Sequence, residues 1–256
     1  MRILIALPGS VGLWPVAFGW AFKARALCEA LVPGCEIHYS GVSSGSVVAF
    51  AMSLGVSMSE LHEVVYRFNE RFRVWYRSVL THYYSEVKQF VKALLSRFGG
   101  VSAVNGRLHV GYTEWGLGGV SSRVLSEFKD ADDVAGAIEA SSNVCLLFRP
   151  FWVRFRGRLC ADGGFGCNTL VLPGYDVVLA LHASDMLSHP GVSYWDVLLS
   201  SDMRKWHRLL YAGESLFERQ RVELERAISR RQGCVVRPSL KLRVLNKLLS
   251  PLRWMF

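Results

Sequence analysis

The stretch SGVSSGSVVAFA, residues 40–51, places two adjacent serines between glycines and continues into a run of small apolar residues. Within it, Gly41-Val42-Ser43-Ser44-Gly45 matches the pattern G-x-S-x-G with Ser43 at its centre. This pattern is typical of a sharp turn from a strand into a helix, where the serine hydroxyl is exposed and glycines remove Cβ atoms that would collide. EIHYS, residues 36–40, reads as the preceding strand, so the sequence predicts a strand, an elbow at Ser43 and a helix.

The segments around this elbow predict an α/β fold in one domain. RILIAL, residues 2–7, is a short aliphatic run that ends at Pro8-Gly9, as expected of a buried strand, and Pro15 suits the first turn of the apolar helix that follows. Strand, helix, strand, turn and helix in this order are typical of the α/β class. The other predicted elements are strands at 107–114 and 120–128, a helix at 130–142, a short strand within 155–170 and a buried strand at 176–183.

The composition fits a large buried core and gives no sign of a disulfide framework or a metal site. The chain has 256 residues, of which 51% are hydrophobic, and this is enough for one domain of this class. Its six cysteines are scattered, without a C-x-x-C pair or a His/Cys cluster at zinc spacing. We therefore expect no metal, and a reducing, intracellular setting is the default expectation.

The first 26 residues allow two interpretations. One Arg precedes an apolar stretch and an A-x-A sequence follows Lys23, as in a signal peptide. The interruptions at Pro8-Gly9 and Trp14-Pro15 instead favour a strand, a turn and a helix. No run reaches the ~18 apolar residues needed to span a bilayer, so the protein is expected to be soluble or to lie on a surface.

The net positive charge is confined to the C-terminal part of the chain. Of the 30 Lys and Arg and the 21 Asp and Glu, 13 and 4 lie from Arg204 onward, a difference of +9, which leaves 17 of each sign before it. We therefore divide the chain into a neutral domain at 1–203 and a basic extension at 204–256. Residues 239–256 place Leu and Val on one helical face, which suits either a membrane or lipid-droplet interface or packing on the domain. Nucleic acid is not expected as a partner, because no recognition motif is present.

A nucleophilic Ser43 needs a base, and the sequence offers two arrangements. The order Ser43, Asp162, histidine fits a Ser-Asp-His triad, with three candidates for the histidine: His182, His189 and His207. In the other arrangement, the acid of Asp162-Gly163-Gly164 lies at a strand end, and the two glycines let another backbone approach closely enough for a direct Ser-Asp pair. A simple Asp-Gly hairpin turn explains the same three residues.

Together these segments resemble the patatin-like phospholipase family, in particular its adiponutrin and adipose triglyceride lipase branch. The resemblance covers most of residues 3–170 and follows the chain in order, through LPGSVGLWPVAFGW, GVSSGSVVAFAMSLGVSMSELHEVV, LHVGYTE with VLSEF, AIEASSNVCLLF and FRGRLCADGGFGCNTL. It is most specific at the elbow, at Asp-Gly-Gly and in their separation. The resemblance implies a three-layer α/β fold, with a central mostly parallel sheet flanked by helices, and a Ser-Asp dyad that acts without histidine, metal or cofactor.

The resemblance also implies roles for individual residues. Ser43 would attack a lipid ester carbonyl and form an acyl-enzyme, and Asp162 would take the serine proton and return it to the leaving alcohol. The oxyanion would be bound by backbone N–H groups of the loop Gly9, Ser10, Val11 and Gly12, and the elbow and dyad-loop glycines would be Gly41, Gly45, Gly163 and Gly164. The family commonly has a cation and more glycines in this loop, whereas here it holds two glycines, no cation and a β-branched Val11 that resists positive φ.

The sequence thus predicts an intracellular, cytoplasmic acyl hydrolase that cleaves phospholipid or acylglycerol esters. It is expected to associate peripherally with a membrane or lipid droplet through residues 239–256. The departure at Val11 leaves an alternative open, a catalytically weak or inactive protein that binds lipid on the same scaffold. A hydrolase with a Ser-Asp-His triad is the third hypothesis.

Overall fold

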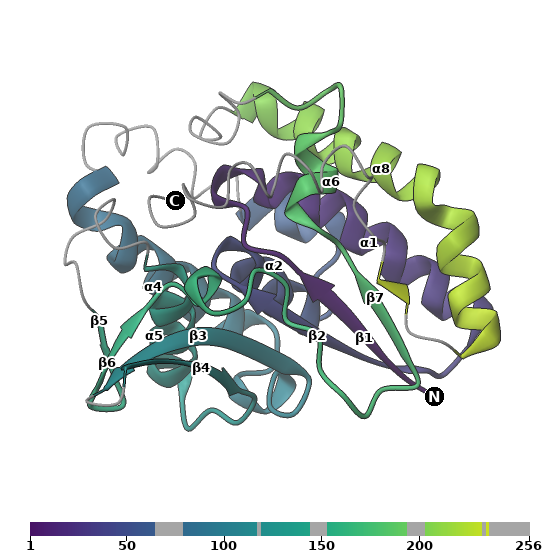
Figure 1. The fold of residues 1–256 in the computed structure, drawn as a ribbon. Coiled ribbons are helices and arrows are strands. Elements are labelled where there is room, and N and C mark those ends of the chain that lie inside the picture. Colours follow the sequence, from purple (N-terminus) through teal and green to yellow (C-terminus); the bar gives the residue numbers. More distant parts are fainter. Residues whose placement is uncertain (65–78, 117–118, 144–152, 194–202, 232–233, 236–256) are drawn as a thin grey trace.

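The computed structural model describes residues 1–64, 79–116, 119–143, 153–193, 203–231 and 234–235 of the chain. An eight-stranded sheet runs through this part of the protein with helices packed against it, so the predicted α/β class is confirmed (Figure 1). The amphipathic segment predicted at 239–256 lies outside the described residues.

The sheet is parallel at its centre and antiparallel at one end. Its strands are β1 Arg2–Leu7, β2 Glu36–Val42, β3 Leu108–Gly116, β4 Gly119–Leu125, β5 Val153–Phe155, β6 Arg158–Ala161, β7 Val177–Ala180 and β8 Cys234–Val235. The strand order is β5-β6-β3-β2-β1-β7-β8, and β4 pairs with β3 beside this path. The parallel pairs are β1–β2, β1–β7, β2–β3 and β7–β8, and the antiparallel pairs are β3–β4, β3–β6 and β5–β6. The sheet is therefore mixed.

The helices follow the predicted order around the elbow. The helices whose bounds lie within the described residues are α1 Trp14–Leu31, α2 Ser44–Ser53, α4 Val79–Arg97, α5 Ala131–Ser142, α6 Ala183–Leu187 and α8 Met203–Arg230, with 3-10 turns η1 Val11–Leu13, η2 Val101–Ala103 and η3 Gly163–Phe165. Residues 58–64 are helical as well. The predicted first strand, the apolar helix after it and the elbow are confirmed. Strand β2 runs two residues further than predicted, to Val42, and so ends directly at Ser43.

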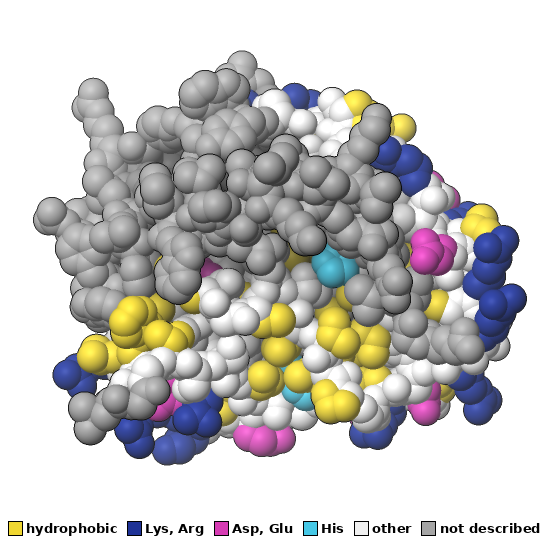
Figure 2. All heavy atoms as spheres, in the orientation of Figure 1, with side chains coloured by type: hydrophobic (Ala, Val, Ile, Leu, Met, Phe, Trp, Pro, Cys, Tyr) yellow, Lys and Arg dark blue, Asp and Glu magenta, His cyan; other side chains and the backbone are white. Residues whose placement is uncertain are grey.

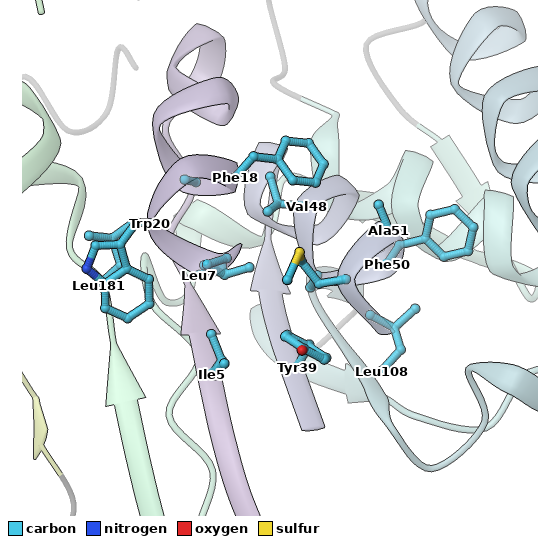
Figure 3. Close-up of a cluster of buried hydrophobic side chains, with 14 of the residues drawn as sticks. Ile5, Leu7, Phe18, Trp20, Tyr39, Val48, Phe50, Ala51, Leu108 and Leu181 are labelled. Carbon is cyan, nitrogen blue, oxygen red and sulfur yellow. The ribbon is translucent and has the colours of Figure 1, made fainter. Parts of the chain in front are cut away.

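Apolar side chains cover both faces of the central strands. Ile5 and Leu7 of β1 point into the hydrophobic core that the sheet shares with α1 and α2 (Figure 3). Leu4 and Ala6 point to the opposite face, because side chains alternate along a strand, and they are fully buried as well. On that face the segment before β7 crosses the sheet. The Ser40 hydroxyl donates a hydrogen bond to the carbonyl oxygen of Leu170 in this segment at 2.6 Å.

Helix α8 packs directly on α1, although it lies in the basic part of the sequence. A Cβ at Gly213 of α8 would collide with the backbone carbonyl of Val16 in α1, so the two helices approach closely at this glycine. Inside the contact, the indole of Trp20 donates to the amide oxygen of Gln220 at 2.8 Å. Many side chains of α8 belong to the same hydrophobic core as residues 1–203. This core therefore extends beyond the predicted boundary at residue 203.

Gly213→Ala is expected to destabilise the protein by about 1–3 kcal/mol, because the added methyl group meets backbone atoms that have no room to move. Helix propensity alone would stabilise this variant by about 1 kcal/mol, so the sign of the change reports the collision. Ser229→Ala, at an exposed position of the same helix, is the control and should change the free energy of unfolding by no more than about 0.5 kcal/mol. Chemical denaturation measures both. A Gly213→Ala variant that gains stability would contradict the close packing of α1 and α8.

Candidate active site

The sheet brings Ser43 and Asp162 together because they follow two strands that run toward each other. The register places β4 along one edge of β3, and both β2 and β6 along the other edge. Strand β2 is parallel to β3 and ends opposite Gly111, whereas β6 is antiparallel and ends opposite Thr113. The residues that come next, Ser43 and Asp162, therefore leave the sheet at neighbouring positions.

Ser43 has the strained backbone of a nucleophile elbow. Its φ of 53° and ψ of −132° place it in a region that non-glycine residues rarely adopt. The turn is so tight that a Cβ at Gly41 would collide with the carbonyl of Gly45, and a Cβ at Gly45 would lie 2.5 Å from the carbonyl oxygen of Pro8. Both glycines of the G-x-S-x-G pattern are thus required by close backbone approach.

A serine that sequence reasoning did not single out fixes the elbow to the sheet. Ser141, at the end of α5, accepts a hydrogen bond from the Ser43 N–H at 2.8 Å. Its hydroxyl donates in turn to the carbonyl oxygen of Gly111 at 2.6 Å. Ser141 therefore ties the nucleophile to β3, at the point where β2 ends. A single serine near a helix end carries no local pattern that would have revealed this role.

Asp162 is held in place by its backbone and by one of its two carboxylate oxygens. Its N–H donates to the Asn143 carbonyl, and its own carbonyl accepts from the Thr113 hydroxyl, both at 2.8 Å. Oδ1 accepts from the N–H of Gly164 at 2.7 Å. Oδ2 is buried and accepts no hydrogen bond from any described residue. The carboxylate thus has one oxygen engaged and one left to accept a proton.

Burial and the Ser43 hydroxyl act in opposite directions on this carboxyl group. Burial raises the pKa of Asp162 to about 6, while the nearby hydroxyl of Ser43 and the N–H of Gly164 act to lower it. The Ser43 hydroxyl is therefore close enough to affect the carboxylate, although the contact lacks the geometry of a full hydrogen bond. Such contacts between a nucleophile and its base are often long or poorly aligned before substrate binds. The structure thus brings the two predicted dyad residues together.

Close packing also requires the first glycine of the Asp-Gly-Gly sequence. A Cβ at Gly163 would collide with the carbonyl of Gly111 on β3. This close approach sets the turn that follows β6 against the same strand that anchors Ser141. The hairpin-turn interpretation is not what the structure shows, because Asp162 is the N-cap of η3.

The loop predicted to bind the oxyanion lies beside Ser43, but some of its donors are engaged. A Cβ at Gly9 would be 3.1 Å from the Ser43 Cβ. The Gly9 N–H donates to the Asn168 carbonyl at 3.0 Å, and the Ser10 N–H donates to the Ser44 hydroxyl at 3.0 Å. Neither N–H is therefore available to a substrate oxygen in this arrangement.

The remaining donors come from two helix starts, where the first N–H groups have no partner within the helix. Val11 and Gly12 begin η1, a 3-10 turn whose negative φ a β-branched residue tolerates. Ser44 begins α2 directly after the nucleophile, a position typical of an oxyanion donor. In the described part of the chain, the N–H groups of Gly12 and Ser44 make no hydrogen bond to another residue. Sequence reasoning missed Ser44, although the elbow pattern implies it.

The histidines considered for a triad lie in other contacts. His182 is the N-cap of α6, His189 accepts from the Gly191 N–H at 3.0 Å, and the ring of His207 lies edge-on to that of His62 at 4.7 Å. Among the side chains that the structure describes, no histidine forms a hydrogen bond with the dyad residues. The geometry therefore offers a carboxylate, and not an imidazole, as the base for the serine.

Two buried cysteines are unsuited to nucleophilic chemistry, and the described residues show no metal cluster. Burial raises the thiol pKa of Cys28 to about 12 and that of Cys160 to about 11, so neither is a thiolate at neutral pH. The described residues include no group of three or more His, Cys, Asp or Glu side chains suited to a metal ion.

Comparison with known proteins gives no relative from which a function could be transferred. No protein-family model matches the chain, and no curated protein is significantly similar to it.

Proposed function

We propose that the protein is a serine acyl hydrolase that cleaves lipid esters through a Ser43–Asp162 dyad on a patatin-like, three-layer scaffold. The observation that carries this proposal is a strained serine beside a buried aspartate whose Oδ2 is free. Strain at an elbow and a raised carboxyl pKa both occur preferentially at catalytic sites. No other acidic or basic side chain forms a hydrogen bond with this serine in the described part of the chain.

The arrangement supports a two-step mechanism. The Ser43 Oγ attacks the ester carbonyl carbon while its proton moves to Oδ2 of Asp162, and the resulting oxyanion accepts hydrogen bonds from the N–H groups of Ser44 and Gly12. The intermediate expels the alcohol, which takes the proton from Asp162 and leaves an acyl-enzyme. Asp162 then accepts a proton from an attacking water, and breakage of the acyl bond returns a proton to Ser43 and releases the carboxylic acid.

The raised pKa of Asp162 helps this chemistry. A carboxylate of ordinary pKa, about 3.9, is a weak base toward a hydroxyl. The value of about 6 brings the group closer to the range in which a general base works best near neutral pH, while leaving it ionised there. Burial is the main cause of the shift, so the same absence of water that raises the pKa also strengthens the contact with the hydroxyl.

A lipid ester is the substrate class that the sequence resemblance favours, and it places the enzyme at an interface. None of the helices in the described part of the chain has the length and apolar character needed to cross a bilayer. We therefore propose peripheral association with an intracellular membrane or lipid droplet, with residues 239–256 as one contributor.

A second candidate function is a lipid-binding protein with little or no catalytic activity. The observation in its favour is the engagement of the Gly9 and Ser10 N–H groups, which removes two of the four predicted oxyanion donors. Loss of one such donor lowers the rate of acyl transfer by about 10²–10³-fold. Measured turnover distinguishes the two candidates.

A fluorophosphonate probe tests the hydrolase directly. It is expected to form a covalent adduct on Ser43, visible as a mass increase of the peptide that holds this residue, because the elbow and Asp162 activate the hydroxyl. Ser43→Ala should abolish labelling, whereas Ser96→Ala, at an exposed serine of α4, should leave it intact. Absence of the adduct, together with vesicle binding and no ester turnover, would select the lipid-binding candidate instead.

A further inference from the structure

The two hairpins that flank Asp162 carry a row of exposed apolar side chains. Cross-strand pairing aligns Val120 of β4, Trp115 of β3 and Leu159 of β6 on one face of the sheet, because directly paired residues point to the same side. These side chains are 53%, 41% and 36% exposed, respectively. This face is the one opposite to Tyr112, which packs against the hydrophobic core.

The row continues on both sides of the dyad loop. Phe165, in η3 directly after Asp162-Gly163-Gly164, is 40% exposed. A Cβ at the next residue, Gly166, would collide with Ser122, so η3 lies against the same face of β4. Leu159 precedes Asp162 by three residues and Phe165 follows it by three. We call Val120, Trp115, Leu159 and Phe165 together the apolar row.

An arginine lies beside the apolar row. Arg154 pairs with Leu159 across β5 and β6 and so extends the row, and it makes no ion pair with any described residue. Arg156 and Arg158 belong to the same hairpin but are ion-paired, Arg156 with Asp133 and Arg158 with Glu114. Strands β3 to β6 hold one acidic residue, Glu114, and it is paired with Arg123 and Arg158 on the other face. Figure 2 shows apolar side chains with Lys and Arg next to them at this end of the molecule.

From this arrangement we propose that the apolar row and Arg154 form the surface through which the protein docks on an anionic lipid layer. A large aromatic with aliphatic neighbours suits insertion among acyl chains, and an arginine at the border suits anionic headgroups. A second copy of the chain fits less well, because two such surfaces bring arginines together without free acids to pair them. The inference rests on the proposed function, since docking here would hold the dyad loop at the layer that contains the ester.

Vesicle sedimentation tests the surface separately from catalysis. In a Ser43→Ala background, binding to vesicles of phosphatidylcholine mixed with phosphatidylserine is expected to fall at least about tenfold on Trp115→Glu, and to fall several-fold on Arg154→Gln. The matched controls lie on α8: Tyr211→Glu replaces an aromatic residue that is 70% exposed, and Arg226→Gln replaces an exposed arginine. These controls should change binding by less than about twofold.

Several outcomes would overturn the proposal. Equal loss of binding in the α8 controls would assign the effect to general charge or to another surface, and unchanged binding in Trp115→Glu would exclude the apolar row. A dimeric mass that becomes monomeric in Trp115→Glu would show that the row binds a second copy. With Ser43 restored, Trp115→Glu should hydrolyse a short soluble ester at the original rate and vesicle lipid more slowly. If the protein is not a hydrolase, neither the soluble ester nor the vesicle lipid is cleaved, and the binding results are unaffected.

Discussion

Asp162→Asn is expected to abolish ester hydrolysis and, at pH 8, to make the protein more stable. The folded protein holds the Asp162 proton up to about pH 6, because burial raises the pKa of this carboxyl group. The unfolded chain loses the proton near the ordinary value of about 3.9. Between these values the folded state binds more protons than the unfolded state, so stability falls as the pH rises through this window. Above pH 6 the ionised, buried carboxylate of Asp162 lowers the free energy of unfolding by its full amount, roughly 3 kcal/mol.

Asparagine has the same shape without the charge, and it therefore removes the penalty. Its amide oxygen still accepts from the Gly164 N–H, and its NH₂ group is placed to donate to the Ser43 hydroxyl. We expect a gain of about 1–3 kcal/mol in the free energy of unfolding at pH 8 and little gain at pH 4. Asp185 is also buried with a pKa raised to about 6, but it is common to both proteins and cancels in the difference.

Activity should fall although stability rises, because the amide in Asp162→Asn does not accept a proton from the serine. Removal of a general base lowers the rate by about 10²–10⁴-fold, and Ser43→Ala should lower it at least as far. The double variant should lose no more than Ser43→Ala alone, since the two groups act as a unit. In the original protein, kcat/KM should rise with pH as Asp162 ionises near pH 6 and then level off.

Asp132→Asn is the matched control for the stability measurement. Asp132 is exposed, and its pKa is lowered by the side chains of Lys88 and Lys92. Its carboxylate is thus stabilising in the folded protein, and the substitution should reduce stability at pH 8 rather than raise it. Denaturant unfolding at pH 4 and pH 8 provides the comparison. An Asp162→Asn variant that is active, or less stable at pH 8 than the original protein, would contradict the assignment of a buried catalytic carboxylate.

The elements next to the site were predictable because local rules determine them. The aliphatic run at 2–7 has the period and the Pro8-Gly9 stop of a buried strand, and the structure forms β1 there. The G-x-S-x-G pattern at 41–45 requires a tight strand-to-helix turn, and close backbone approach at both glycines explains it. Asp162 was identifiable because two glycines after an acid indicate a close approach of chains.

The contacts that complete the site depend on residues that are distant in the sequence. Nothing in the local pattern of β6 shows that it runs antiparallel to β3 along the edge it shares with β2, yet this pairing brings Asp162 to Ser43. Ser141 acts through the end of a helix that meets the elbow only in the folded chain. Sequence reasoning singled out Val11 as the doubtful donor of the Gly9 loop, whereas the N–H groups that are engaged are those of Gly9 and Ser10, whose acceptors belong to other segments.

Gly41→Ala is expected to lower both activity and stability, and it has the second largest effect that we predict. The new Cβ would overlap with the carbonyl of Gly45, which is backbone and cannot rotate away as a flexible side chain would. The turn between β2 and α2 has to open, at a cost of about 1–3 kcal/mol in the free energy of unfolding.

The loss of activity should exceed what this destabilisation explains. Opening the turn moves Ser43 relative to Asp162, and a displacement of about 1 Å at a catalytic group lowers the rate by about 10²-fold. Gly116→Ala, on β3, is the control: no heavy atom lies within 4 Å of the added Cβ, and its φ is not in the left-handed region. It should change stability by no more than about 0.5 kcal/mol. If folded Gly41→Ala kept the original kcat/KM on a short soluble ester, the position of the serine in this elbow would not be what makes it reactive.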